Sequence, residues 1–249
     1  MLQIAESVRL SSAPLTFSAF GGLRGMQVDQ VRAFWRVVER FEPGVQLRCR
    51  LGQPAKRGVV LSGWLCEMRI LPDGRRQIFS FLLPGDPFVI EEDTDIGRRG
   101  VVALTRVEAI DLTNPLLANL EARDSLAQAV LEAAEWRQER LLDHMVRIGR
   151  LTARERVLHL LLELFDRLDG VGLVKSDSFR IPLTQNIFAD ALGLSLVHIN
   201  RTLKQLRQEG LILLRGGSVT LLNRNKLAAL AFYESSHRHP ETGSDLAAL

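Results

Sequence analysis

Metal-binding and redox-active side chains are scarce in this sequence. Two of the 249 residues are cysteines, Cys49 and Cys66, and they form no Cys-x-x-Cys pair. This content excludes a disulfide scaffold and a zinc finger, and it fits a reducing compartment. Histidine is scarce as well, because there are only five and none precedes His144. A metal-dependent enzyme needs clustered histidine and carboxylate ligands, so we do not expect an enzyme.

Long hydrophobic runs are also absent. No apolar run approaches the ~20 residues that cross a bilayer, and the N-terminus lacks the charged-then-apolar pattern of a secretion signal. Hydrophobic residues make up 46% of the chain and charged residues 24%, which is typical of a folded soluble protein. We therefore expect a cytoplasmic protein without membrane contact, built around two modest cores rather than one.

The most strongly patterned stretch covers residues 182–215. Thr184 is placed to cap a first helix, and Gly193 stands where the end of that helix requires a positive φ. Ser195 caps a second helix, which ends at Gly210. Two helices joined by a short Gly-containing turn are the arrangement that places a recognition helix in the major groove of DNA. The alternative, on this pattern alone, is an ordinary pair of packed helices.

The local charge favours DNA binding. Between residues 178 and 226 there are seven Lys or Arg side chains and two acidic ones, a net charge of +5, whereas the whole chain carries +3. Positive charge is thus concentrated where phosphate binding requires it. The second helix has an apolar face, formed by Leu196, Ile199, Leu203 and Leu206, and a polar face, formed by His198, Arg201, Lys204, Arg207 and Gln208.

Two stretches of the sequence resemble one protein family. The helix-turn-helix signature of the Crp/Fnr family of bacterial transcription regulators is similar to LTQNIFADALGLSLVHINRTLKQLRQEGLI, and the family's β-roll is similar to SGWLCEMRILPDGRRQIFSFLLPGD. The resemblance implies an α+β fold: an N-terminal double-stranded β-roll (jelly-roll-like), a long dimerisation helix and a C-terminal winged helix-turn-helix domain. The implied domains are residues 1–112, 113–149 and 150–249.

The hydrophobic pattern is consistent with this division. Between Val45 and Ile110 apolar residues alternate with polar ones and are interrupted by Gly- and Pro-containing turns, which indicates a sandwich or small barrel. Residues 28–41 have helical spacing and predict a short helix. Residues 211–222 predict a two-stranded wing around Gly216-Gly217, and residues 227–233 a short closing helix.

A long helix is expected from about Thr113 to Ile148, with Pro115 in its first turn. Its apolar residues recur at alternating steps of four and three, as in a coiled coil. The residues expected at a dimer interface are Leu131, Ala134, Gln138, Leu141, Met145 and Ile148. A second stripe, formed by Val130, Trp136, Leu142 and Val146, is expected to pack on the β-roll. The alternative is a helix buried against its own domain.

The break after this helix predicts a hinge. Gly149 is a candidate C-cap, and Thr152 with Glu155 forms a capping box that starts the next helix. In a dimer, such a hinge would set the separation of the two recognition helices.

The N-terminal turns of the recognition helix carry the candidate base contacts. Arg201 is the main candidate, because its guanidinium can donate two hydrogen bonds to guanine O6 and N7. Asn200 suits adenine, and Leu196 and Val197 suit a thymine methyl group. His198 either contacts DNA or packs under the turn. Contacts to phosphates are expected from Thr184, Gln185, Ser195 and Lys204.

One position departs from the family pattern. The best-known members have a Glu at the position of Val197, which accepts a hydrogen bond from cytosine N4. Valine cannot accept one, so their operator half-site does not transfer to this protein.

The resemblance also suggests where an effector would bind. Cyclic-nucleotide members hold the phosphate with Gly-Glu-Leu and Arg-Ser-Ala stretches, and the equivalent span here is GDPFVIEEDTDIGRRGVVALT. Arg99 is the candidate effector-binding residue, with Glu91 or Glu92 in place of the family's glutamate. The glycine is missing, acidic residues lie nearby, and Leu141 and Leu142 replace the adenine-binding Thr-Ser pair. We therefore expect no dependence on cyclic AMP.

Other cofactors are not expected either. The iron–sulfur members need N-terminal cysteines, and the haem members need particular His or Cys residues in the roll. Cys49 and Cys66 are more simply explained as small buried apolar side chains than as a redox switch. We therefore assign no cofactor, and the effector is unknown.

Together these features predict a homodimeric transcription regulator that binds a pseudo-palindromic double-stranded DNA operator. By analogy with the family, RNA polymerase is the expected partner, contacted through the loop at 169–176. The alternative is a ligand-binding or protein-interaction module with a vestigial helix-turn-helix.

Overall fold

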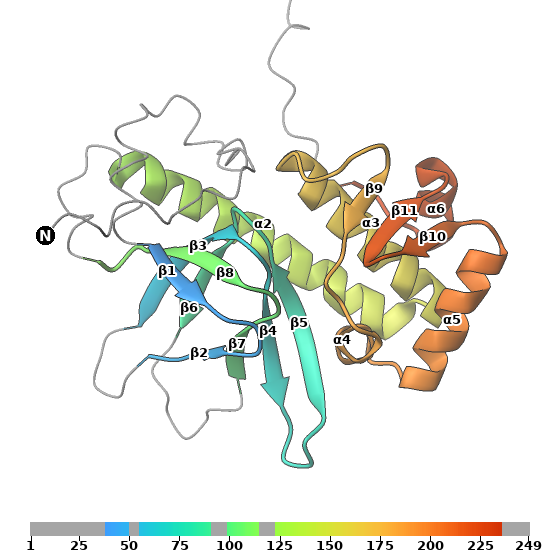
Figure 1. Cartoon of the computed structure of the whole chain (residues 1–249), viewed down its shortest axis with the longest axis horizontal. Helices are drawn as coiled ribbons and strands as arrows, with labels where there is room; N and C mark the ends of the chain where they lie inside the picture. The colour runs from blue at the N-terminus through green and yellow to red at the C-terminus, as the bar shows by residue number, and fades with distance from the viewer. Residues whose placement is uncertain (1–37, 50–54, 91–98, 115–122, 236–249) are drawn as a thin grey trace, which may run out of the picture.

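Two four-stranded antiparallel sheets face each other in the N-terminal half of the chain (Figure 1). The structure is a computed structural model that describes residues 38–49, 55–90, 99–114 and 123–235, with only the backbone at 99 and 123–135. The first sheet has the order β1 (Val38–Phe41), β8 (Val107–Asp111), β3 (Lys56–Ser62) and β6 (Pro87–Ile90). The second has the order β2 (Gln46–Leu47), β7 (Arg99–Ala103), β4 (Leu65–Ile70) and β5 (Arg76–Leu82).

Strand alternation gives the second sheet two apolar faces. In β4, Leu65 belongs to the core between the two sheets, whereas its neighbour Cys66 belongs to a second core shared with the C-terminal helices. In β5, Leu82 likewise belongs to the core between the sheets, and Phe81 to the core shared with the helices. Successive side chains of a strand point to opposite faces, so this sheet is covered on both sides. The roll and the helical part therefore share one continuous hydrophobic core.

Three segments follow the roll in the order helix, helix and winged helix-turn-helix. Helix α2 (Arg123–Arg150) runs along the roll towards the helical end of the molecule, and α3 (Ala153–Gly170) begins there (Figure 1). The remaining elements are β9 (Ser178–Arg180), α4 (Gln185–Leu192), α5 (Leu196–Gln208), β10 (Ile212–Arg215), β11 (Ser218–Leu221) and α6 (Arg224–Ala231). Strands pair in the order β10-β11-β9, and α3 packs against α4, α5 and α6. The expected α+β fold is confirmed.

Two local expectations are wrong. The predicted helix at 28–41 is contradicted at its end: Val38–Phe41 is strand β1, paired with β8 from Val38–Ile110 to Phe41–Val107, and residues 28–37 lie outside the described part. Pairing with a strand about seventy residues away overrides the local helical spacing. Gly149 does not end α2 but lies inside it, one residue before its last residue, Arg150.

The start of α3 follows the prediction. The Thr152 hydroxyl accepts a hydrogen bond from the backbone N–H of Glu155, and the Glu155 carboxylate accepts one from the backbone N–H of Thr152 at 2.8 Å. Only Leu151 and Thr152 separate the two helices, so the elbow between them is short. Within the described residues, no helix is both long enough and apolar enough to cross a membrane.

Candidate DNA-binding surface

Three capping contacts build the helix-turn-helix as the sequence predicts. The Thr184 hydroxyl accepts from the backbone N–H of Ile187, and the Ser195 hydroxyl accepts from that of His198, both at 3.3 Å. Gly193 ends α4 in the left-handed conformation with φ +63°, which glycine adopts without steric cost. These contacts fix the angle between α4 and α5.

The apolar face of α5 holds it on the protein. Ile199, Leu203 and Leu206 are buried in the core shared with α3. Thr202 is buried beside them, outside the apolar face that the sequence predicts. Leu196 belongs to the predicted apolar face but is 44% exposed at the first turn, and this exposure suits its other predicted role as a DNA contact.

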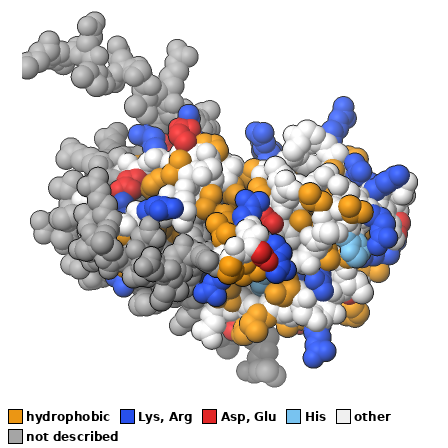
Figure 2. All heavy atoms as spheres, turned by 90° about the horizontal axis from the view of Figure 1, so that it is seen from below, with side chains coloured by type: hydrophobic (Ala, Val, Ile, Leu, Met, Phe, Trp, Pro, Cys, Tyr) orange, Lys and Arg blue, Asp and Glu red, His pale blue; other side chains and the backbone are white. Residues whose placement is uncertain are grey.

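The predicted DNA contacts all lie outside the core. His198 is half-buried and the other candidates are exposed: Thr184, Gln185, Ser195, Leu196, Val197, Asn200, Arg201 and Lys204. Val197 is the most exposed large hydrophobic residue among those described, at 79%. Lys and Arg side chains are exposed at the end of the molecule that carries α5, and a histidine lies among them (Figure 2). The outer face of α5 is therefore accessible to a ligand.

Known proteins share both this motif and this architecture. The model of the Crp-like helix-turn-helix domain matches residues 155–230. The nitrogen fixation regulation protein FixK of Bradyrhizobium diazoefficiens is 32% identical over 176 residues, which are 69% of this chain and 72% of that protein. The chain belongs to the Crp/Fnr family. It is therefore a DNA-binding transcription regulator of the Crp/Fnr type.

Other members agree with this assignment. The transcriptional activatory protein AadR of Rhodopseudomonas palustris is 30% identical over 168 residues, 66% of this chain and 68% of that protein. The structure of FixK2 from Bradyrhizobium japonicum superposes with a TM-score of 0.61 at 25% identity, covering 78% of this chain and 96% of that one. A CooA mutant from Carboxydothermus hydrogenoformans has a TM-score of 0.63 at 15% identity over 90% and 98% of the two chains, and so shares the fold.

The helix-turn-helix of this Crp/Fnr member is bound directly to its β-roll. Arg76 of β5 forms a 2.7 Å ion pair with Asp190 of α4, and the Gln77 amide donates to the Ala191 carbonyl at 3.3 Å. Arg156 of α3 donates to the Leu192 carbonyl at 3.0 Å. The last carbonyls of a helix lack partners within the helix, and here side chains from two other elements satisfy them. The sequence pattern predicts none of these contacts.

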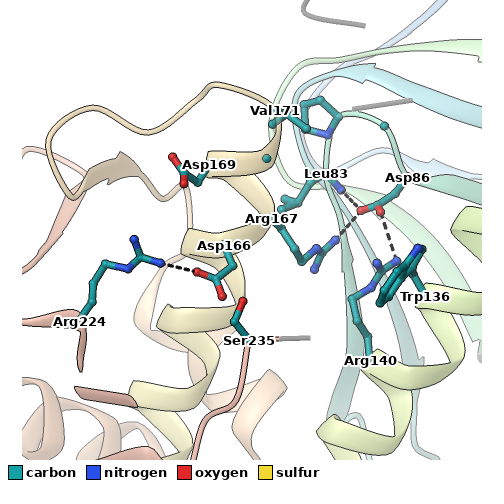
Figure 3. A pocket seen from close by; sticks show the side chains of 13 residues that line it. Leu83, Asp86, Trp136, Arg140, Asp166, Arg167, Asp169, Val171, Arg224 and Ser235 are labelled. Atoms are coloured by element: carbon teal, nitrogen blue, oxygen red, sulfur yellow. Dashed lines mark hydrogen bonds and ion pairs between the residues drawn. The ribbon is translucent and has the colours of Figure 1, made fainter. Parts of the chain in front are cut away.

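A chain of buried charges joins α2, the roll and α3. Asp86, in the turn between β5 and β6, accepts from the Leu83 backbone N–H at 2.7 Å and pairs with Arg167 and, at 3.2 Å, with Arg140 (Figure 3). Glu163 pairs with Arg167 at 3.0 Å and with Arg147.

A second ion pair reaches the roll from the same face of α2. Arg137 binds Glu67 of β4, with Nη2 2.7 Å from Oε2. The face that α2 turns to the protein is therefore cationic through three arginines: Arg137, Arg140 and Arg147 follow one another with the buried His144 among them, at steps of three or four residues. That spacing is visible in the sequence and is the signal by which this face is recognisable.

These neighbours shift the pKa values of the buried groups. Burial alone would raise the pKa of Glu163, but the charges of Arg147 and Arg167 outweigh it and lower that pKa to about 2. Burial is likewise outweighed at Asp86, whose pKa is lowered by Arg167 and Arg140. Burial, with the charge of Arg147 second, lowers the pKa values of His144 and His159 to about 4. Both carboxylates are thus ionised and both imidazoles neutral near pH 7.

Acid is expected to destabilise the fold from about pH 6.5 downwards. An unfolded imidazole titrates near pH 6.5, whereas His144 and His159 take up protons in the folded protein only near pH 4. The unfolded chain therefore binds more protons between these values, and the free energy of unfolding falls as the pH decreases. Below about pH 4.5, Glu163 adds to the loss, because its pKa in the folded state is about 2.

Urea unfolding at several values between about pH 7.5 and 5 measures this slope, with an expected uptake of about two protons on unfolding near pH 5. The double variant His144→Leu/His159→Gln serves as the control and should have a flatter profile. A wild-type profile that is flat across the window would contradict the prediction.

A cavity of about 320 Å³ lies where the roll, α2, α3 and α6 meet (Figure 3). Its lining includes Asp86, Trp136, Arg140, Asp166 and Arg224. The side chain of Arg99, the candidate effector-binding residue, is not described. Arg99 starts β7 opposite Arg69, and residues 91–98, which include Glu91 and Glu92, lie outside the described part.

The outer face of α2 is apolar and exposed. Leu142, Met145 and Val146 are 50%, 65% and 53% exposed, and Trp136 is 41% exposed. The prediction that the second stripe packs on the roll is therefore wrong for Trp136, Leu142 and Val146, because the cationic face of α2 takes that place; the side chain of Val130 is not described. Among the expected dimer residues, Gln138 and Met145 are exposed and Leu141 and Ile148 half-buried, whereas the side chains of Leu131 and Ala134 are not described.

The two cysteines are buried, as expected. Cys49 lies in the core between the sheets and Cys66 in the core shared with the helices. Burial raises the pKa of the Cys66 thiol to about 12, which disfavours the reactive thiolate at neutral pH.

Proposed function

We propose that this protein is a homodimeric regulator that recognises a pseudo-palindromic operator with α5. The observation that carries the proposal is the division of α5: Ile199, Leu203 and Leu206 are buried in the core, whereas the candidate DNA contacts of its N-terminal turns are exposed or, at His198, half-buried. A recognition helix enters the major groove with those turns. Residues 1–112 would act as the sensor, 113–149 as the dimerisation helix and 150–249 as the DNA-binding domain.

The proposed contacts divide into base recognition and phosphate binding. Arg201 recognises guanine, Asn200 adenine, and Val197 and Leu196 a thymine methyl group. Thr184, Gln185, Ser195 and Lys204 hold the phosphates that fix the register of α5 on the duplex. His198 lies on α5 between Val197 and Asn200 in the sequence, beside the residues proposed to recognise bases.

The exposed face of α2 supports dimerisation. Three large apolar side chains of one helix, Leu142, Met145 and Val146, are each at least half exposed in the single chain. Contiguous exposed apolar surface of this kind marks interaction sites. In a two-fold dimer the same face of each copy meets its counterpart. Met145 is the residue that this face shares with the expected coiled-coil seam, which also contains the exposed Gln138 and the half-buried Leu141 and Ile148.

Met145→Glu is expected to convert the dimer into a monomer. At a two-fold interface the new carboxylate meets its own counterpart, and like charges brought together without water are strongly disfavoured. Sedimentation equilibrium should give the single-chain mass of 27.9 kDa instead of twice that value. Leu213→Glu is the matched control, because Leu213 is 49% exposed on the wing, away from α2. A dimeric Met145→Glu would contradict an interface through this face.

A signal in the roll would reach α4 through Arg76 and Gln77 and reach α3 through Asp86, and so shift the population of binding-competent dimers. We propose that this signal is neither cyclic AMP nor an iron–sulfur cluster, since the sequence lacks the phosphate-binding glycine and the N-terminal cysteines. Arg99 is our candidate contact for an effector.

RNA polymerase is the proposed partner of the dimer on DNA, and the loop at 169–176 is the proposed contact.

Selection of bound duplexes from a random DNA pool tests the proposal. The expected result is a two-fold-symmetric motif with half-sites about one helical turn apart. A vestigial helix-turn-helix, the alternative, would select no motif, with or without cell extract, and would bind no DNA even at low salt.

A further inference from the structure

The recognition helix contains a side-chain contact that the sequence pattern does not predict. Nη2 of Arg201 lies 3.0 Å from Nε2 of His198. The two residues are three apart on α5 and therefore lie on the same face. Arg201 is exposed and His198 is half-buried. An exposed guanidinium is thus held by a ring that is itself partly packed, on the turns that the proposed function directs at DNA.

The direction of this hydrogen bond follows from the chemistry of the two groups. A guanidinium has five N–H donors and no acceptor, so His198 accepts through Nε2. The imidazole is then neutral and carries its proton on Nδ1. One shared donor leaves four on Arg201, enough for two hydrogen bonds to guanine O6 and N7. The contact is therefore compatible with base recognition.

We propose that His198 is a positioning residue for base recognition, holding the Arg201 guanidinium in the orientation that contacts guanine. The inference rests on the proposed function. A free arginine side chain samples many rotamers, and this freedom is lost when it binds a base. If His198 already restricts the side chain, part of this loss occurs before binding. His198 then increases affinity and guanine preference without touching the base.

A double-mutant cycle on the selected operator tests this role. His198→Ala is expected to weaken binding by about two- to tenfold, the effect of one hydrogen bond, and to reduce the preference for guanine. In an Arg201→Ala background the same substitution should change neither quantity. His198→Gln provides an amide oxygen that accepts from Arg201, and it should restore most of the affinity and preference.

Lys204→Ala is the matched control. Lys204 is exposed on the same helix, and loss of a phosphate contact weakens binding to all duplexes alike, so the guanine preference should remain. Thermal unfolding of each variant confirms that α5 is folded. Equal effects of His198→Ala with and without Arg201 would show that His198 contacts DNA itself and would overturn the proposal, as would no rescue by Gln.

The two proposals fail in distinguishable ways. If the wild-type protein selects no motif, the proposed function fails and this inference falls with it. If the wild-type protein selects a motif that His198→Ala binds with unchanged affinity and preference, only the inference is overturned.

Discussion

Arg201→Ala is expected to weaken binding to the selected operator by about 5- to 150-fold, which corresponds to the roughly 1–3 kcal/mol of a bidentate contact to a base. Arg201 is exposed on the second turn of α5, and Ile199 and Leu203 on either side anchor the helix in the core. The substitution therefore removes the guanidinium without disturbing the fold.

The loss should depend on sequence. Duplexes altered at the one guanine in each half-site should bind the variant about as well as the operator does, because the variant no longer distinguishes that base. Fluorescence anisotropy at fixed salt, with the operator and the three altered duplexes, measures both quantities.

Lys204→Ala is the control that distinguishes the loss of a base contact from the loss of a positive charge. Its binding should fall by a similar factor on every duplex, and the slope of log K against log salt should decrease by about 1. If Arg201→Ala behaves in this way instead, Arg201 binds a phosphate and our assignment of the base contact is wrong.

Glu163→Gln is expected to lower the free energy of unfolding by about 3–5 kcal/mol, the usual effect of breaking a buried ion pair. Glu163 is the partner of both Arg147 and Arg167, and its side chain is 11% exposed. The amide keeps the shape but removes the negative charge, so two buried guanidinium groups lose their shared counter-charge. The melting temperature should fall by roughly 6–20 °C.

Glu139→Gln is the control for this substitution. Glu139 is exposed on α2, so the change in its unfolding free energy should stay within about 0.5 kcal/mol. Differential scanning calorimetry at neutral pH compares the variants with the wild-type protein. A Glu163→Gln protein as stable as the control would mean that the network is hydrated or rearranged, and that Glu163 does not hold α3 to α2.

The helix-turn-helix could be predicted because its determinants are local. Thr184, Gly193 and Ser195 each form the cap or turn that their side chain, or the lack of one, favours within a few residues. The exposure of the candidate base-contacting residues follows from the same information, because α5 turns the apolar side of a 3.6-residue repeat inwards.

The roll and the outer face of α2 were less predictable. Val38–Phe41 has helical spacing with the preceding residues, yet it is a strand because β8 offers it a pairing partner. Leu142 and Val146 look like core residues, but they are exposed because a cationic stripe occupies the inner face of α2. A hydrophobicity pattern cannot anticipate that arginines will be buried, since this depends on acidic partners such as Glu67, Asp86 and Glu163 in other elements.

The sequence by itself determined the family, the α+β fold class, the caps of α4 and α5 and the side chains that α5 presents. These depend on neighbours within one or two helical turns. Only the tertiary structure decided how the parts join: Asp190 on Arg76, Asp86 between Arg167 and Arg140, and His198 on Arg201. The first two need elements distant in sequence to be brought together, and the third needs one rotamer among many. The helical repeat can place a residue on a face, but it names neither the distant partner nor the rotamer.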